Sequence, residues 1–308
     1  MALTRNRLLL AKAETTYGTS SSPAGADALL VSNLDVSPLE LSRIDRELVR
    51  SKLGQSGMIV GQRMVQVSFD VELAGSGTAG TAPAWGPIIK ACGFAETIVA
   101  TTSVAYSPVS SSFSSVTLDF NHDGTKHLIT GARGSFSVGL KANEIPKLSF
   151  KMMGLYNAPT ASAQLTPTWS NQADPVVVNS TNTTPVSVHS FAACLESFSM
   201  DLKNETPFRQ LAGCTQQVRI TDRKPAGEIS IEAPALGTKD FFAIASAQTT
   251  GAISWTHGQT AGNIVAFAAP TCSFDSPKYG DSDGVAMLSL PYIAIASSGN
   301  DDFTLTLT

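Results

Sequence analysis

Strict alternation of apolar and polar residues over 64–73 constrains the fold of this chain more than any other feature. In MVQVSFDVEL, one alternate set of side chains is apolar and the other is polar. Successive side chains of a β-strand point to opposite faces, so the pattern predicts a strand with one buried and one wet face. The segment EISIEA at 228–233 repeats the pattern, with Ile229 and Ile231 pointing inward. We therefore expect a mainly β protein.

Turn signals predict hairpins after the first of these strands. Asp123-Gly124 lies between the apolar runs SVTLDF and TKHLIT, and Asp-Gly in that position is a strong hairpin signal. A second hairpin is predicted over 134–156, with its turn at Asn143-Glu144. Helices are few and short. We expect one over 86–93, opened by Pro87, and one over 238–247, capped by Thr238.

The order of these elements repeats on either side of a polar linker. Residues 157–190 are rich in Ser, Thr, Asn, Ala and Pro, with one short strand expected at 176–178. The sequence thus predicts two tandem antiparallel β-sandwich domains, 1–156 and 191–308, each with a short flanking helix and a long loop. The alternative is that the repeated order reflects no internal duplication, because any two antiparallel β domains look alike at this level of detail. The strands expected in the two halves are 29–36, 64–73 and the hairpins 115–130 and 134–156, then 193–202, 227–233, 250–268, 271–276, 285–296 and 303–308.

Composition limits the functions that suit this chain. Only 15% of its 308 residues are charged, which suggests a surface buried against other copies, because interface cores are depleted in charge. The net charge of -4 argues against a protein that binds nucleic acid tightly. No apolar run approaches the length of a membrane span. The four cysteines form no C-x-x-C pair and are expected to be buried reduced thiols.

No motif in the sequence assembles a catalytic, cofactor or metal site. The run at 75–80 matches G-x-G-x-x-G literally but no helix opens within it, so a flexible loop is expected. Residues 281–284, DSDG, lack the distal ligands of a calcium loop and predict a hairpin turn. His122 and His127 flank a turn without an acidic or thiol partner nearby in sequence. We expect neither an enzyme nor a bound cofactor.

The charged excursion at 37–62 is the most distinctive segment. Its apolar residues lie near helical spacing, so an amphipathic helix packed on its own domain is one interpretation. An RNA-binding arm is another, but aromatic residues that would stack on bases are absent. A charged loop with embedded apolar residues suits a contact with another subunit. The residues expected to make it are Leu41, Arg43, Ile44, Arg46, Glu47, Leu48, Arg50 and Lys52.

Three features together resemble the major tail tube proteins of long, non-contractile-tailed (siphovirus-like) bacteriophages. One is the strand followed by a charged loop over 8–54, and another is the Asp-Gly hairpin, Gly-Ala-x-Gly step and polar turn over 119–156. The third is the short helix after the first sheet strand. The resemblance covers residues 1–156 well and 191–308 more loosely, and it involves no catalytic motif.

The resemblance implies a structural virion protein of the tail. In that family, six β-sandwich domains close their inner sheets into one barrel per ring, and a long loop reaches the adjacent ring. Either three two-domain copies or six copies would form each ring, with a tape measure protein and tail terminator or distal tail proteins as partners. Assembly is expected in the host cytoplasm, without a membrane, and double-stranded DNA would pass through without specific binding.

A conduit for DNA needs a wet and weakly adhesive lining. Carboxylates repel phosphate, so the polar faces of two strands are candidates to line the channel, although they would suit an outer surface as well. These residues are Gln66, Ser68, Asp70, Glu72, Glu228, Ser230 and Glu232. The rival interpretation from another class is a capsid decoration protein or a receptor-binding β-sandwich.

Overall fold

The computed structural model describes residues 3–51 and 53–308, and the fold is mainly β. The first half holds β1 (Arg7–Ala13), β2 (Ala28–Leu29), β3 (Ser32–Asp45), β4 (Met58–Glu72), α1 (Gly86–Ala91), β5 (Phe94–Val99), β6 (Ser103–Pro108), β7 (Val116–His122), β8 (Thr125–Lys141) and β9 (Lys147–Tyr156). The remainder holds β10 (Thr160–Ala161), β11 (Thr183–Val188), β12 (Phe191–Ala192), β13 (Leu195–Asp201), β14 (Phe208–Arg209), β15 (Gln217–Val218), β16 (Ala226–Glu232), α2 (Phe241–Ser246), β17 (Gly251–His257), β18 (Val265–Phe274), β19 (Lys278–Ser282), β20 (Val285–Ala294) and β21 (Thr304–Leu307). No helix among the described residues is long and apolar enough to cross a membrane.

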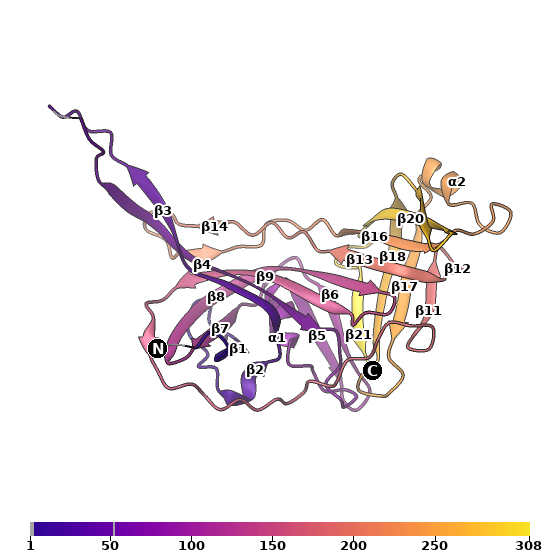
Figure 1. The fold of residues 1–308 in the computed structure, drawn as a ribbon, viewed down its shortest axis with the longest axis horizontal. Coiled ribbons are helices and arrows are strands. Elements are labelled where there is room, and N and C mark those ends of the chain that lie inside the picture. Colours follow the sequence, from indigo (N-terminus) through magenta and orange to yellow (C-terminus); the bar gives the residue numbers. More distant parts are fainter. Residues whose placement is uncertain (1–2, 52) are drawn as a thin grey trace.

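One antiparallel sheet runs through both halves of the chain (Figure 1). Its strands follow the order β3, β4, β9, β8, β13, β16, β20, β19. The halves join where β8 pairs with β13 over five opposed residues, Ser137–Lys141 with Ser197–Asp201. The sequence predicted two tandem sandwiches, and the division at residues 156 and 191 stays a prediction, because this sheet is continuous across it.

A second layer covers the apolar face of this sheet. Strands β5, β6, β21, β18, β17 and β11 pair in that order, and β21 joins β6 of the first half to β18 of the second. Strand β1 pairs with β7, and β7 pairs with the first part of β8. Figure 1 shows these strands on one side of the long sheet.

Aromatic rings fill the space between the layers. Phe303 of the C-terminal segment lies 5.4 Å from Phe94, 6.4 Å from Phe136 and 5.6 Å from Phe267, measured between ring centroids. Phe198 continues the cluster with a centroid 5.0 Å from that of Phe267. All five rings are buried and belong to one core that spans both halves. Burial of such rings dominates the stability of a core, so the two halves stabilise each other.

The predicted hairpins are confirmed. Asp123 and Gly124 connect β7 to β8 with φ of 44° and 92°, the left-handed pair that a two-residue hairpin turn requires. Asn143, with φ of 64°, lies in the turn between β8 and β9. Asp283 and Gly284 connect β19 to β20 in the same way, which confirms the predicted hairpin turn.

Several local predictions were wrong. The cap of α2 is Asp240, whose Oδ1 accepts a hydrogen bond from the Ala243 amide at 2.9 Å, and not Thr238. Residues 176–178 form no strand; Val178 is instead buried, and its backbone exchanges hydrogen bonds with Asn143 and Glu144. The strand expected from residue 271 is the continuation of β18, and the strand expected over 29–36 is divided between β2 and β3. Cys92 and Cys272 are buried, whereas Cys194 and Cys214 are exposed.

The glycine-rich loop at 75–80 serves a packing role. Gly75 lies against Gly262 of the β17–β18 turn, and a Cβ built on Gly75 would come within 2.0 Å of the Gly262 carbonyl oxygen. The Gly75 amide donates to Asn263 Oδ1 at 2.7 Å, and the Gly77 amide donates to the Gly262 carbonyl at 3.0 Å. Only glycine permits this approach of the two backbones, which ties the first half to the second.

Candidate assembly surfaces

The strand register places both sets of proposed lining residues on one face of one sheet. Glu72 lies opposite Lys147, Lys147 opposite Gly139, Gly139 opposite Ser199, and Ser199 opposite Glu228. Directly opposed residues in an antiparallel sheet point to the same side. The alternate residues of β4 and β16 that the sequence singled out therefore share a continuous surface, here called the polar face.

The polar face is wet and carries both signs of charge. Gln66, Glu72, Glu228 and Glu232 are exposed, and Ser68 and Asp70 are half-buried. Ser230 is only 8% exposed and donates to Glu196 Oε2 at 2.7 Å, so it contributes little to this surface. Sequence reasoning missed the contribution of β9, where the alternation of Lys147, Ser149 and Lys151 gave the signal. These lysines lie opposite Glu72 and Ser68.

Small side chains occupy the middle of the polar face, where the two halves join. A groove of about 570 Å³ follows the β8–β13 junction. Serine, glycine, lysine and carboxylate residues are among those that line it. Its lining includes Ser137, Gly139, Ser199, Lys147, Asp201 and Glu228. Apolar atoms also contribute to the lining, including those of Pro291 and Ile293, so the groove is an open, concave surface of mixed polarity.

Hydrogen bonds hold several polar-face carboxylates in place. Asn33 Nδ2 donates to Asp70 Oδ2 at 2.7 Å, and Gln66 Nε2 donates to Glu40 Oε2 at 2.7 Å. Ser289 Oγ donates to Glu228 Oε1 at 2.6 Å. Neutral partners leave the negative charge of these groups uncompensated, so the carboxylates keep their repulsion for other anions.

The charged excursion is a long β-hairpin. Strands β3 and β4 continue past the body of the molecule and carry residues 46–51 and 53–57 at their tip (Figure 1). The amphipathic-helix interpretation is therefore wrong. The strand predicted from residue 64 begins at Met58, and alternation did not reveal this extension because Met58, Ile59 and Val60 are all exposed. Period-two patterning reports burial on one face, and a hairpin free in solvent has no buried face.

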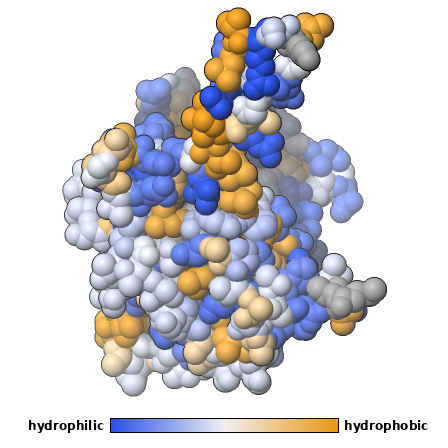
Figure 2. All heavy atoms as spheres, turned by 90° about the vertical axis from the view of Figure 1, so that its left-hand side faces the viewer, coloured by the Kyte–Doolittle hydropathy of each residue, from blue (hydrophilic) through white to orange (hydrophobic). Residues whose placement is uncertain are grey.

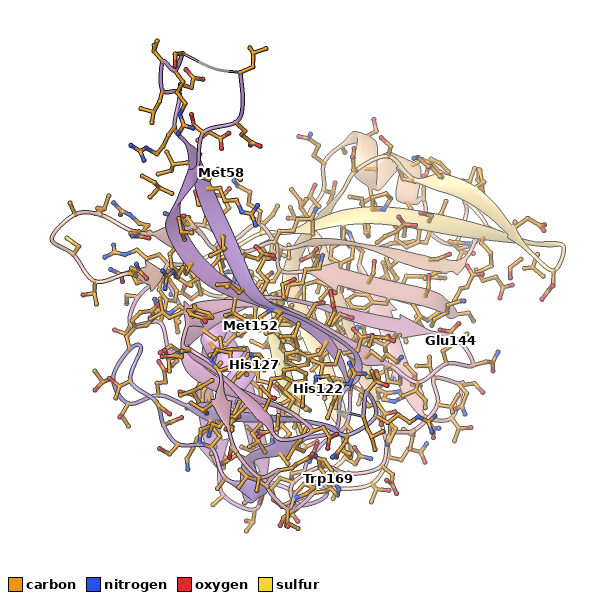
Figure 3. All side chains as sticks on the ribbon, turned by 60° about the vertical axis from the view of Figure 1, so that its left-hand side comes forward. Met58, His122, His127, Glu144, Met152 and Trp169 are labelled. Carbon is orange, nitrogen blue, oxygen red and sulfur yellow. The ribbon has the colours of Figure 1, made fainter. Side chains whose placement is uncertain are left out.

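Apolar side chains run along the hairpin and are open to solvent. Figure 2 shows them on the projecting arm, and Figure 3 marks Met58 at the start of β4. Monomeric proteins rarely expose a contiguous apolar surface of this kind, so the hairpin is a candidate interaction site. Its members are Leu39, Ile44, Leu48, Val49, Leu53, Met58, Ile59 and Val60.

The contact residues expected from sequence lie on this hairpin. Leu41, Arg43 and Ile44 belong to β3, with Arg43 opposite Val60 and Ile44 opposite Ile59. Arg46, Glu47, Leu48 and Arg50 lie at the tip and are exposed, and Lys52 falls outside the described residues. Arg43, Arg46 and Arg50 form no ion pair with any described carboxylate. Their charges are thus available to another molecule.

The equivalent segment of the second half, 202–225, follows a different path. Its short hairpin of β14 and β15 returns to the first half, where Tyr17 Oη accepts a hydrogen bond from the Val218 amide at 2.6 Å. Asn204 Nδ2 donates to the carbonyls of Cys92 and Gly134 at 2.7 and 2.9 Å. Of these two segments, it is the hairpin of the first half that remains a free arm.

Titratable groups outside these surfaces are explained by packing. The rings of His122 and His127 both stack on Phe120, with centroids 6.0 and 5.8 Å away (Figure 3). Burial lowers the pKa of His127 and His257 and raises the pKa of the Cys272 thiol to about 12. Among the described residues, no group of three His, Cys, Asp or Glu side chains could hold a metal ion.

Comparison with known proteins agrees with this geometry. A family described as phage tail tube protein matches residues 4–294, which is nearly the whole chain. A search of curated proteins finds no match. The match extends through both halves of the sheet and through the projecting hairpin. Members of this family are structural proteins of the virion tail that assemble with themselves into a tube. This chain belongs to the phage tail tube protein family.

Proposed function

We propose that copies of this chain close into rings, and that stacked rings enclose a channel through which the phage genome passes into the host. The observation that carries the proposal is the continuous polar face, which extends over eight strands from both halves. The aromatic core and the second strand layer occupy the opposite side of the sheet. A ring built from this sheet has room on its inside only for the face that no other layer covers.

The chemistry of the polar face suits the passage of DNA. Serine and glycine in its middle keep the channel wide, and uncompensated carboxylates repel phosphate. Lys147 and Lys151 are spaced among polar and acidic residues. Binding of DNA strengthens with each phosphate that a cation neutralises, so interspersed carboxylates keep adhesion low.

The projecting hairpin suits contact between successive rings. Its exposed apolar residues would be buried against the neighbouring ring, and its free arginines would add charge contacts around them. Three copies per ring follow if each half supplies one tube unit. The ends of the tube would meet a tape measure protein and tail terminator or distal tail proteins, and assembly would occur in the host cytoplasm.

Two experiments test the proposal. Negative-stain microscopy of the concentrated protein should show stacked rings or tubes, and monodisperse particles under every condition would favour a decoration or receptor-binding module. In phage, Glu72→Lys adds a lysine opposite Lys147 and should slow genome ejection several-fold without changing tail length. Asp174→Lys, at an exposed linker position, is the matched control. Normal ejection by the Glu72→Lys phage would refute the lining role.

A further inference from the structure

The same set of strand pairings occurs twice in this chain. In the first half, β1 pairs with β2 and β7, β3 with β4, β4 with β9, and β8 with β7 and β9. In the second half, β11 pairs with β12 and β17, β13 with β16, and β16 with β20. Strand β18 pairs with β17 and β20, and β19 pairs with β20, so β18 and β19 together correspond to β8. The strand order in the long sheet is therefore one four-strand unit followed by another, β3-β4-β9-β8 and β13-β16-β20-β19.

The junction between these units shows how the last strand of one pairs with the first strand of the next. Across β8 and β13, Ser137 lies opposite Asp201, Val138 opposite Met200, and Gly139 opposite Ser199. Val138 and Met200 are fully buried on the core side of this junction. The chain thus contains one completed example of the contact between units.

The outer edges of the sheet have no such partner in the part of the chain that the structure describes. Among the described residues, β3 pairs only with β4, and β19 pairs only with β20. Figure 1 shows β3 at one end of the molecule and β20, the strand that pairs with β19, at the other. Unpaired strand edges present rows of free N–H and C=O groups that template pairing with another chain. In the repeated arrangement, β19 corresponds to β8 and β3 corresponds to β13.

Equivalent residues can be read directly from the register. Gly139 lies opposite Lys147 and Gly280 opposite Met287, and Leu-Ser follows in both strands, at 148–149 and 288–289. Four residues after Lys147, Lys151 lies opposite Ser68. Four residues after Met287, Pro291 lies opposite Glu228. Across the next pairing, Ser68 lies opposite Asp35 and Glu228 lies opposite Ser199. Gly280 is thus equivalent to Gly139, and Asp35 to Ser199.

We propose that β19 of one copy pairs antiparallel with β3 of a second copy in one defined register. That register sets Lys278 opposite Ser37, Tyr279 opposite Val36, and Gly280 opposite Asp35. The inference rests on the proposed ring and deepens it, because it names the two edges that close the ring and their alignment. It also makes the internal β8–β13 junction and the contact between copies two instances of one interface.

Side chains at the two free edges are complementary in this register. Tyr279 is 65% exposed and lies opposite the buried Leu288, so it projects on the core side, where its ring contacts Phe242 of α2 at a centroid distance of 5.2 Å. Val36 is half-buried on the core side of β3, opposite the buried Val67. Pairing buries the two against each other, as Val138 and Met200 are buried internally. On the polar face, Lys278 comes beside the Asp35 carboxylate, a diagonal cross-strand pair of opposite charge.

Engineered disulfides distinguish this register from others. Directly opposed residues bring their Cβ atoms to about 5 Å, close enough for a disulfide after small adjustment. The starting protein carries Cys194→Ser and Cys214→Ser, because these two cysteines are exposed. In tubes of the Ser37→Cys/Lys278→Cys variant, mild oxidation should link most chains into covalent multimers on non-reducing gels. A link within one chain is excluded, since seven strand spacings separate the two edges by about 34 Å.

Two matched variants complete the experiment. Ser137→Cys/Asp201→Cys reproduces the opposed pair of the internal junction and should form an intramolecular disulfide under the same conditions. Ser37→Cys/Ser282→Cys moves one cysteine four residues along β19, about 13 Å, and should link less than a tenth as many chains. The pairing is overturned if tubes form and the internal pair links, but Ser37→Cys/Lys278→Cys does not, or if the displaced pair links better. If the starting protein forms no tubes at any concentration, the proposed function itself fails.

Discussion

Met200 lies directly opposite Val138 across the pairing of β13 with β8, and both side chains are fully buried. The two residues come from different halves of the chain and meet beneath the polar face. Around them, Phe198 and Phe136 extend the same core into each half. The junction is therefore a packed interior and not a surface contact between separate bodies.

Truncation of this junction should destabilise the whole chain. Met200→Ala removes buried apolar volume, and such changes cost about 2–5 kcal/mol of unfolding free energy. Because one core spans both halves, denaturant unfolding should remain a single transition with a lower midpoint. Leu211→Ala, at an exposed position, is the control and should leave the midpoint within error. Two separate transitions in the starting protein would contradict a shared core.

A mostly buried ion pair joins the C-terminal segment to Arg223, which also contacts the first half. Asp302 Oδ2 lies 2.8 Å from Arg223 Nε and 2.7 Å from Arg223 Nη2, while Arg223 Nη1 donates to the Val109 carbonyl at 3.1 Å. Asp302→Ala leaves the guanidinium without its partner, which typically costs about 3 kcal/mol when the pair is shielded from water. Thermal unfolding measures the loss. Asp222→Ala, which removes one of the two carboxylates that pair with the exposed Lys224, should change stability little.

The tip of the hairpin should matter for assembly and not for folding. Val49 is fully exposed, so Val49→Asp removes no contact within the chain. The new carboxylate would be buried where we propose that the hairpin contacts the adjacent ring, and an unpaired buried charge is costly. We expect an unchanged melting temperature and at least a tenfold rise in the concentration needed for tube formation, followed by light scattering. Val49→Leu should assemble normally, and equal assembly by both variants would contradict the inter-ring role.

Stability should fall in mild acid because of buried histidines. Burial lowers the pKa of His257, whose Nδ1 lies 2.8 Å from Thr183 Oγ1 and whose Nε2 lies 3.1 Å from the Val176 carbonyl oxygen. Burial also lowers the pKa of His127 and His189. The unfolded chain therefore binds more protons than the folded chain as pH falls below about 6.5, and the free energy of unfolding decreases there.

Chemical denaturation at pH 7.5 and 5.5 measures this dependence. His257→Gln keeps a polar side chain at the site but cannot titrate in this range, so it should reduce the difference between the two pH values. An identical pH dependence in the variant would show that His257 does not contribute.

Local patterns predicted much of the secondary structure. Alternation identified the body of β4 and β16, and Asp-Gly identified the turns at 123–124 and 283–284, because each depends on neighbours in the chain. The same reasoning failed at the hairpin and at 176–178. Met58, Ile59 and Val60 form a strand with both faces exposed, and Val178 is buried by residues distant in sequence. Neither environment leaves a periodic signature.

The sequence by itself determined the β class, the two polar strand faces and the presence of a charged excursion between strands, since side-chain order and turn chemistry are local properties. Only the tertiary structure decided that Glu72 and Glu228 share one face, that the excursion is a free hairpin, and that β8 pairs with β13. Strand partners and register arise from hydrogen bonds and core packing between residues far apart in the chain, and no local pattern specifies them.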